Sequence, residues 1–266
     1  MPQWTLFGLL TGKQTAPWPL AQGDDGQQGF LGMPRYKPEL CSDDCRACAD
    51  ICPTIAITLN ASASGGRLDI DYGRCIVCQL CTEACPVGAM SPSSDWAFGV
   101  RSRNDLIWSE SAPAAPRQAA EERRPFRRSL HVRHVDAGSC NGCESELQAL
   151  NNPFYNLHRL GIFFTASPRF ADLLLVTGPI TNAMLEPLRA TYEAMADPRW
   201  VVAVGTCAVS GGIAEGGYAS GHGLDGVIPV DVYLPGCPPN PAAIIEALLM
   251  FLDRVPQRVK GGRLGE

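Results

Sequence analysis

The sequence predicts an α/β protein in two parts, a small α+β unit near the N-terminus and a larger domain built on a parallel sheet. Two observations carry this prediction. Eight of the twelve cysteines stand in two short runs between residues 41 and 85, with strand-like segments after each run. Beyond residue 129, short apolar runs alternate with segments of helical pattern, which is typical of parallel strands joined by helices.

The composition is that of a globular protein long enough for two domains. The chain has 266 residues, of which 45% are hydrophobic and 18% charged, so disorder is not expected. Its formal net charge of −5 gives no support for nucleic-acid binding, which requires a basic surface. We therefore expect no nucleic-acid partner.

Residues 1–37 are rich in Gly, Pro and Gln and are expected to form a docking arm. The apolar stretch at residues 4–10 could lie on a membrane surface, contact a partner, or pack on the rest of the chain. It lacks the basic flank and the small-residue cleavage site of a secretory signal, and no stretch approaches the ~18 apolar residues of a membrane span. Six disulfides would require a secreted chain, so we expect a cytosolic protein with reduced cysteines.

Residues 38–98 are predicted to hold two iron–sulfur clusters. The second cysteine run follows C-x2-C-x2-C-x3-C-P without deviation, which is the ligand run of bacterial two-cluster ferredoxins. The first run has three residues instead of two between Cys41 and Cys45, which loosens its loop. Short strands are expected at residues 56–59 and 89–90, with a turn at Gly65 and Gly66. The two runs contain Cys41, Cys45, Cys48, Cys52, Cys75, Cys78, Cys81 and Cys85.

Residues 99–128 change in composition to Ala, Pro, Ser, Glu and Arg and are expected to form an exposed linker. The second domain is predicted over residues 129–256, followed by a tail at 257–266. Its strands are expected at residues 130–135, 171–177, 200–205 and 227–234. Its helices are expected from Ser139 as the N-cap to residue 149, over residues 182–196, and from the N-cap Asn240 with Pro241 to residue 252.

The remaining cysteines, Cys140, Cys143, Cys207 and Cys237, are far apart in sequence but share one predicted location. Three of them directly follow a strand, at the carboxyl edge of the sheet where ligands bind, and Cys143 lies three residues after Cys140 on a helical turn. Flanking glycines and prolines let backbone N–H groups approach a cluster closely. A structural zinc would also accept four thiolates, but the cluster-bearing unit in the same chain favours a third [4Fe–4S] cluster.

Four ordered motifs in the second domain are Cys140-Asn-Gly-Cys143-Glu144, Val176-Thr-Gly-Pro-Ile-Thr181, Gly205-Thr-Cys207-Ala-x2-Gly-Gly212 and Val230-Asp-Val-Tyr-Leu-Pro-Gly-Cys237-Pro-Pro239. Through them, residues 129–254 resemble the small subunit of energy-converting, formate-hydrogenlyase-type (group 4) [NiFe]-hydrogenases. That family is homologous to the B subunit of NADH–quinone oxidoreductase. The resemblance implies a flavodoxin-like parallel-sheet domain.

Residues 5–95 separately resemble the two-cluster ferredoxin subunit of the same complexes, the I subunit of complex I. The matching segments are residues 29–34, 38–41 and 68–78. The chain is therefore similar to a natural fusion of two subunits, a flavodoxin-like domain preceded by a small α+β bacterial-ferredoxin-like domain. In such ferredoxins the fourth cysteine of each run binds the other cluster. The resemblance implies three [4Fe–4S] clusters, on Cys41, Cys45, Cys48 and Cys85; on Cys75, Cys78, Cys81 and Cys52; and on Cys140, Cys143, Cys207 and Cys237.

The resemblance implies an oxidoreductase subunit that relays electrons through three clusters to or from an active site in a large partner subunit. The complex would be a membrane-associated respiratory or energy-converting hydrogenase. Its partners would include a hydrogenase-like or complex I-like large subunit and a membrane arm, and they would hold the chain on the cytoplasmic face of the inner membrane. No nickel-ligand motif is present in the sequence, so no catalytic residue is expected in this chain.

Two alternatives stay open. A component that resembles the B subunit, within an NADH- or ferredoxin–quinone oxidoreductase, would donate electrons to quinone. Quinone-reducing relatives of this type carry two adjacent cysteines at the first position, whereas Cys140 and Cys143 are separated by two residues, which favours the hydrogenase branch. A free ferredoxin-like carrier with a regulatory α/β domain would be a soluble monomer. Glu144 is a candidate for proton-coupled behaviour, or a carboxylate that stabilises a helix N-terminus.

Overall fold

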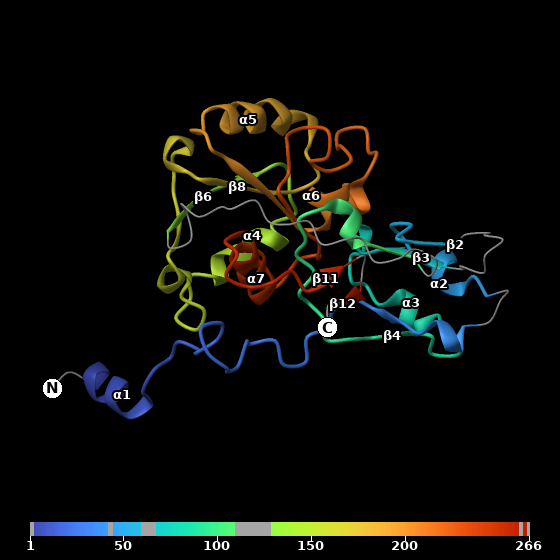
Figure 1. The fold of residues 1–266 in the computed structure, drawn as a ribbon, viewed down its shortest axis with the longest axis horizontal. Coiled ribbons are helices and arrows are strands. Elements are labelled where there is room, and N and C mark those ends of the chain that lie inside the picture. The colour runs from blue at the N-terminus through green and yellow to red at the C-terminus, as the bar shows by residue number, and fades with distance from the viewer. Residues whose placement is uncertain (1–2, 42–44, 60–67, 110–128, 261–262, 265–266) are drawn as a thin grey trace.

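In the computed structural model the chain forms two packed parts, with the ferredoxin-like part beside the larger sheet domain (Figure 1). The structure describes residues 3–41, 45–59, 68–109, 129–260 and 263–264. The turn predicted at Gly65 and Gly66 lies outside the described residues, as do residues 110–128 of the predicted linker.

The larger part is built on five parallel strands in the order β10-β9-β8-β6-β7. Counted from β6, this is the 2-1-3-4-5 order of a flavodoxin-like sheet, so the predicted fold class is confirmed. The strands are β6 (Leu130–Asp136), β7 (Ile162–Phe164), β8 (Leu173–Thr177), β9 (Trp200–Val204) and β10 (Val232–Leu234).

Helices cover both faces of this sheet. α5 (Asn182–Glu193) lies over one face, and α4 (Gly142–Ala149) and α7 (Pro241–Phe251) lie under the other (Figure 1). Leu174 and Val176 of β8 belong to the core on the α5 side, whereas Leu173 and Leu175 belong to the core on the α7 side. Because its residues face two covered layers in alternation, β8 is buried along its whole length.

The starts of two helices show how the chain approaches the sheet edge. α7 begins as predicted, because the Asn240 side chain accepts a hydrogen bond from the Ala243 N–H at 2.7 Å and Pro241 follows. The predicted N-cap of α4 is wrong. Ser139 instead accepts from the Asn141 N–H at 3.0 Å and donates to Glu144 at 2.6 Å, and the helix starts after Asn141. The extra turn holds Cys140 outside the helix.

The ferredoxin-like part is a small α+β unit. β1 (Arg35–Tyr36) pairs antiparallel with β4 (Met90–Ser91), and a second antiparallel sheet has the order β2-β3-β5. Because β1 belongs to this unit, the unit begins before residue 38. Its other elements are α2 (Ala47–Asp50), β2 (Ile57–Leu59), β3 (Leu68–Asp71), α3 (Leu80–Glu83) and β5 (Ile107–Ser109).

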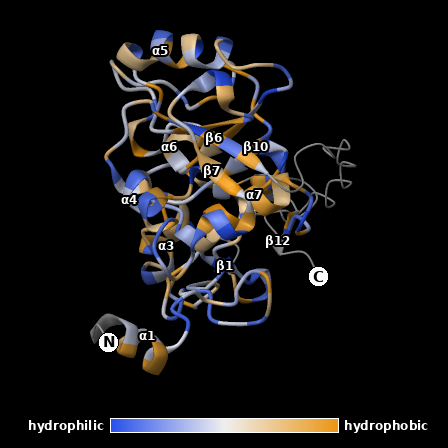
Figure 2. Ribbon diagram, turned by 90° about the vertical axis from the view of Figure 1, so that its left-hand side faces the viewer, coloured by the Kyte–Doolittle hydropathy of each residue, from blue (hydrophilic) through white to orange (hydrophobic). Residues whose placement is uncertain are grey.

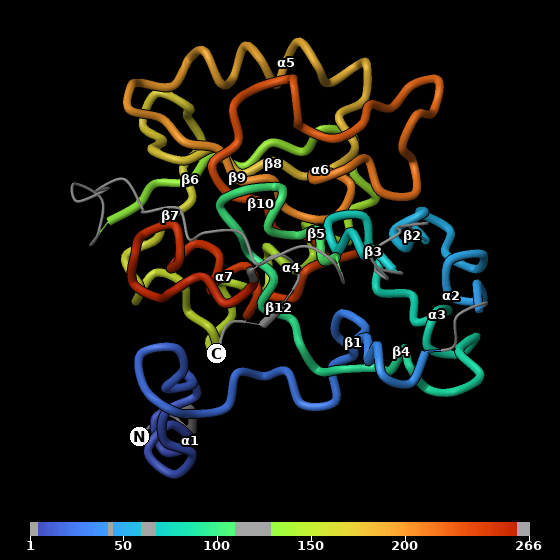
Figure 3. The backbone as a smooth tube through the Cα atoms, turned by 45° about the vertical axis from the view of Figure 1, so that its right-hand side comes forward, coloured from blue at the N-terminus to red at the C-terminus, as the bar shows by residue number. Residues whose placement is uncertain are grey.

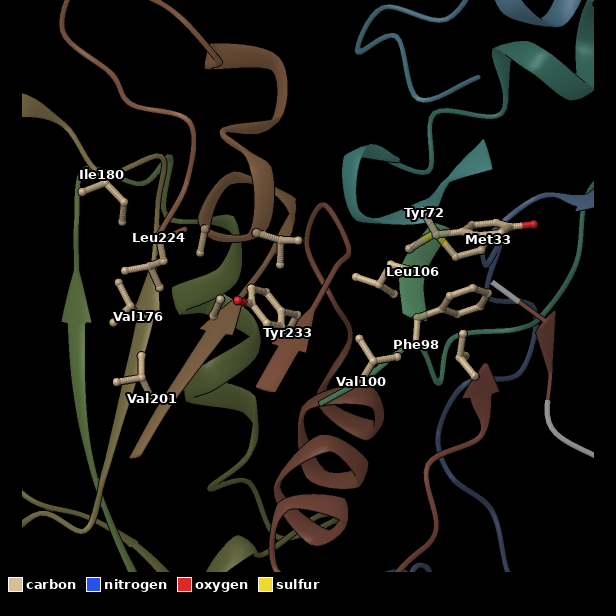
Figure 4. Packing of buried hydrophobic residues seen from close by; sticks show 14 of the residues in the cluster. Met33, Tyr72, Phe98, Val100, Leu106, Val176, Ile180, Val201, Leu224 and Tyr233 are labelled. Carbon is tan, nitrogen blue, oxygen red and sulfur yellow. The ribbon is translucent and has the colours of Figure 1, made fainter. Parts of the chain in front are cut away.

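The first part of the predicted linker is packed instead of exposed. Val100 forms a two-way backbone bridge with Tyr233 of β10, at 2.9 and 2.8 Å, and β5 then returns to pair with β3. Val100, Leu106 and Trp108 are buried, and Figure 4 shows Val100 and Leu106 between Tyr72 of one part and Tyr233 of the other. Buried apolar side chains therefore join the two parts into one continuous core.

The predicted docking arm docks onto its own chain. Arg159 donates to the backbone oxygens of Ala16 and Trp18, and the Trp18 ring packs edge-on against Trp96 and Tyr155 at centroid distances of 6.0 and 6.5 Å. The arm then runs along the body to β1 (Figure 3). Its first element, α1 (Gln3–Thr11), stands apart from the body with apolar residues coloured orange in Figure 2.

The predicted tail also begins as packed structure. The Gln257 side chain accepts from the Arg101 N–H at 3.0 Å and donates to Asp105 at 2.8 Å, and Val259 is fully buried. β11 (Val259–Lys260) pairs with β12 (Arg263–Leu264). In the described part of the chain no helix has the length and apolar character needed to cross a bilayer.

Candidate iron–sulfur cluster sites

The structure gathers one set of cysteines around a cavity in the ferredoxin-like part. Cys75 and Cys81 are both shielded from water, which raises the pKa of each thiol to about 12. Cys52 and Cys78 add to this effect on both groups as neighbouring negative charges. The cavity walls include Cys52, Cys75, Cys78 and Cys81 together with Thr54, Ile57, Ile70 and Leu80. These are the four cysteines that the crossing pattern assigns to one cluster.

A second set lies around Cys48, which belongs to α2. Burial raises the pKa of Cys48 to about 11, and the nearby Cys41, Cys45 and Cys85 raise it further. Cys85 behaves differently, because the backbone N–H groups of residues 87–90 outweigh its burial and lower its pKa. Because Cys85 raises the pKa of Cys48, it lies in space beside the cysteines of the first run, although in sequence it belongs to the second run. Residues 42–44, between the two cysteines with the unusual spacing, lie outside the described residues.

Backbone N–H groups point at the sulfurs in both halves of the unit. Ala56 N donates to Cys52 Sγ and Met90 N donates to Cys85 Sγ, both at 3.3 Å. In each half the chain makes this approach through a residue with a left-handed backbone, Ile55 (φ 52°) and Gly88 (φ 69°). N–H groups aimed at sulfur stabilise its negative charge, as iron–sulfur ligands require.

The third set meets at the carboxyl edge of the parallel sheet. Cys140 follows β6, Cys207 lies in α6 (Thr206–Ser210) after β9, and Cys237 follows β10. Burial raises the pKa of Cys143 strongly, and the charges of Glu144, Cys207, Cys237 and Cys140 add to this. Burial also raises the pKa of Cys207 to about 11, with Cys237 and Cys140 contributing. Cys140 and Cys237 are exposed, so this set lies at the surface.

Glycines leave room around the third set. A Cβ on Gly205, whose φ is +87°, would lie 2.6 Å from Cys143 Sγ, and a Cβ on Gly212 would lie 3.1 Å from Cys207 Sγ. The approach at Gly205 is closer than a side chain tolerates, and the approach at Gly212, whose φ is +58°, is tight, so the backbone at both positions favours glycine. The site therefore has the close backbone approach that a large sulfur-bound group requires.

The donor chemistry of all three sets fits an iron–sulfur cluster. Each set offers four thiols and no nitrogen ligand, which matches the ligation of a [4Fe–4S] cluster. In the described ranges, no three His, Cys, Asp or Glu side chains meet closely enough to hold a single metal ion. The ligand assignments remain predictions.

A polar network lies behind Cys143. Glu144 accepts from the hydroxyls of Ser139 and Thr177, and His134 Nε2 lies 3.0 Å from Thr177 Oγ1 and 3.6 Å from Glu144 Oε1. Burial lowers the pKa of His134, although the charges of Glu144 and Asp136 oppose this effect. Glu144 thus lies in a hydrogen-bonded row that leads from the third set toward β6 and β8, and the sequence did not predict its partners.

Two contacts join the ferredoxin-like part to the third set. Thr206, directly before Cys207, donates its hydroxyl to the carbonyl oxygen of Cys75 at 2.8 Å. Arg74, directly before Cys75, forms a two-point ion pair with Glu215, with Nη1 3.1 Å from Oε1. The sequence did not predict these contacts, because Thr206 and Arg74 were marked only by their position next to a cysteine and Glu215 by no signal at all.

Comparison with known proteins supports both parts of this description. Residues 140–251 match the family model described as NADH ubiquinone oxidoreductase, 20 kDa subunit, and residues 40–89 match a 4Fe-4S dicluster domain. A probable membrane-bound hydrogenase subunit of Pyrococcus furiosus is 44% identical over 134 residues, which are 50% of this chain and 80% of that protein. An uncharacterised Methanocaldococcus jannaschii protein is 50% identical over 123 residues, 46% of this chain and 82% of its own length.

Formate hydrogenlyase subunit 7 of Escherichia coli is 41% identical over 143 residues, which are 54% of this chain. The chain spans only 56% of that relative. Among solved structures, a subunit of an archaeal membrane-bound sulfane sulfur reductase is 34% identical with a TM-score of 0.43, over 51% of this chain and 76% of that one. An NAD+-reducing [NiFe]-hydrogenase chain is 25% identical with a TM-score of 0.38, over 48% and 94%.

The fold, the grouped thiols and the dicluster domain define an iron–sulfur protein. The extent of the shared sequence confirms the family predicted from the motifs. The chain belongs to the family of the NADH ubiquinone oxidoreductase 20 kDa subunit and the hydrogenase small subunits, with a two-cluster ferredoxin domain at its N-terminal side.

Proposed function

We propose that this chain is the iron–sulfur electron-transfer subunit of a membrane-associated energy-converting hydrogenase of the formate-hydrogenlyase type. The observation that carries the proposal is the gathering of twelve cysteines into three groups of four, of which the last lies at an exposed sheet edge. The proposed ligand sets are those implied by the resemblance, with Cys85 and Cys52 each crossing to the other run. When bound, the clusters supply one-electron storage and release.

The contact between Thr206 and Cys75 supports one order of the sites. The set that contains Cys75 lies beside the third set, and the set around Cys48 lies beyond it. Electrons would therefore enter or leave through the Cys48 set and reach the third set through the Cys75 set. The protein holds these sites in order, and it buries Cys75 and Cys81 of the middle set.

The exposed third set supports a large partner subunit that covers it. Cys140 and Cys237 are open to solvent, and the loop after Cys207 exposes the large apolar side chains of Ile213 and Tyr218. Exposed apolar side chains beside an open cofactor site suit a protein interface. In the proposed complex the catalytic metal would lie in the partner, and the partners would hold the chain on the cytoplasmic face of the inner membrane.

A quinone oxidoreductase is the second candidate, because the matching family model takes its description from that enzyme. Metal analysis of the native complex decides between the two. The complex is purified without oxygen through a tag on this chain, and nickel and iron are measured per copy. We expect nickel with about twelve irons. Twelve irons without nickel would move the chain to the quinone-reducing branch, and zinc with about eight irons would show a zinc site in the second domain.

A further inference from the structure

We propose that Thr206, together with the Arg74–Glu215 ion pair, forms a joint that holds the Cys75 set of the ferredoxin-like part against the third set. The inference rests on the proposed electron relay and identifies the residues that position it. One electron passes across this joint and no bond is made or broken, so these residues act by position alone.

Thr206 connects the ligands of two sets at one point. Its hydroxyl donates to the Cys75 carbonyl oxygen at 2.8 Å and accepts from the Gly236 N–H at 3.0 Å. Its own N–H donates to the Gly236 carbonyl oxygen at 2.9 Å. Gly236 directly precedes Cys237, and Thr206 directly precedes Cys207. The Thr206 side chain therefore contacts the backbone of Cys75 and also the two segments that carry Cys207 and Cys237 of the third set.

The position of Thr206 is enclosed and specific for a hydroxyl. The residue is 1% exposed, and both the acceptor and the donor around its oxygen are backbone groups that have fixed places. A buried hydroxyl with both partners satisfied strengthens the packing of the surfaces it joins. Valine has the same shape and lacks the hydroxyl, so it would leave the Cys75 carbonyl and the Gly236 N–H without this partner.

Arg74 and Glu215 close the joint on its outer side. The guanidinium and the carboxylate meet at two points, and both side chains are about three-quarters buried, at 28% and 24% exposure. Arg74 Nε also donates to the Thr54 carbonyl oxygen at 3.0 Å, which anchors the arginine within the ferredoxin-like part. A two-point arginine–carboxylate pair fixes orientation as well as distance. The pair therefore adds a second fixed point beside the Thr206 contact.

The first experiment measures hydrogen exchange over residues 72–77 in the purified complex, which needs no redox reaction. Thr206→Val should accelerate exchange about fivefold, because a hydrogen bond of this kind contributes about that factor to a docking equilibrium. Thr206→Ser keeps the hydroxyl and should restore the slow exchange. Thr191→Val removes a hydroxyl from the exposed face of α5 and serves as the matched control.

The second readout follows electron arrival at the third set by electron paramagnetic resonance after the ferredoxin-like part is reduced. In Thr206→Val the fast phase of electron arrival at the third set should disappear while the iron content stays unchanged. Glu215→Gln, nine residues away in sequence, should show the same loss. Unchanged exchange and unchanged transfer in both variants would overturn the proposal. Loss of iron in Thr206→Val would also overturn it, since Thr206 would then support the ligands themselves. An unmodified complex with fewer than about twelve irons would contradict the proposed function, while the exchange comparison would still test the joint.

Discussion

Ile55 and Gly88 occupy matching places in the two halves of the ferredoxin-like part. Both positions have a positive φ, which glycine adopts easily and isoleucine does not. Each follows a Cys-Pro pair and has a positive φ, 52° at Ile55 and 69° at Gly88. A β-branched residue is strained in this region by ~1–2 kcal/mol, whereas glycine adopts it freely. Ile55 is also 65% exposed, so its side chain gains little from packing.

Replacing Ile55 with Gly should therefore stabilise the protein. The relief of strain exceeds the greater chain entropy of glycine, and the expected net gain is up to ~1 kcal/mol, or about 2–4 °C. The measurement is the temperature at which the visible absorbance of the clusters is lost. The reverse change, Gly88→Ile, is the matched control and should lower that temperature. A lower temperature for Ile55→Gly would show that the exposed isoleucine contributes a contact in the assembled complex.

Gly205 should be essential for the third site alone. Gly205→Ala would place a methyl group 2.6 Å from Cys143 Sγ on a backbone with φ +87°. We expect the iron content to fall from about twelve to about eight per chain, with the ferredoxin-like clusters retained. Gly142→Ala is the control, because its Cβ would lie 3.6 Å from Cys140 Sγ, an ordinary contact. Equal iron in both variants would contradict the assignment of Cys143 as a ligand.

The cysteines could be predicted from the sequence because their spacing indicates cluster ligands. The polar contacts around them could not be predicted. Thr177 and His134 reach Glu144 from two different strands, and Glu215 reaches Arg74 across the boundary between the two parts. Polar contacts between distant segments leave no periodic pattern in a single chain. Such contacts appear only when the fold has brought the segments together.

At the scale of elements, long apolar runs were predictable and short or mixed ones were not. β8, β9 and α7 lie within two residues of their predicted bounds. β7 was missed, because an edge strand of three residues is too short to show a pattern. β10 covers only the end of its predicted range, since residues 227–231 form a loop before the strand.

β5 was missed because its surroundings have the composition of a linker. Trp108 is 8% exposed and packs edge-on against Tyr36 at 5.2 Å, whereas its neighbour Ile107 is 41% exposed. Trp108→Ala should destabilise the ferredoxin-like part by ~3–5 kcal/mol, which corresponds to a drop of roughly ten degrees in the temperature of cluster loss. Ile107→Ala on the same strand should change that temperature little. Equal effects of the two variants would mean that β5 does not pair as described.

At the scale of the whole molecule, the N-terminal arm connects both parts from outside. Met33 N donates to the Asp95 oxygen at 2.9 Å in the ferredoxin-like part, and Ala16 N donates to the Phe154 oxygen at 2.9 Å in the other. Arg159 holds the arm by two further backbone oxygens. The sequence predicted docking here but not the docking surface, because glycine-rich and proline-rich segments carry no periodic face.

Arg159→Gln should release the arm without removing any cluster. Hydrogen exchange over residues 14–22 should become faster by an order of magnitude, since two hydrogen bonds from a charged donor are lost. The iron content should stay unchanged. Arg169→Gln, on an exposed arginine, is the control. Wild-type exchange in Arg159→Gln would show that the packing of Trp18 against Trp96 and Tyr155 holds the arm by itself.

The chain crosses between its two parts more than once. It leaves the ferredoxin-like part to pair Val100 with β10, returns to pair β5 with β3, and then enters the sheet domain at β6. Two separate subunits with the same surfaces would have to find each other in solution, and their contact would weaken on dilution. Here the partner surfaces share one covalent chain, so their effective concentration is set by geometry. The rate of transfer between them should be first order and independent of how much protein the cell makes.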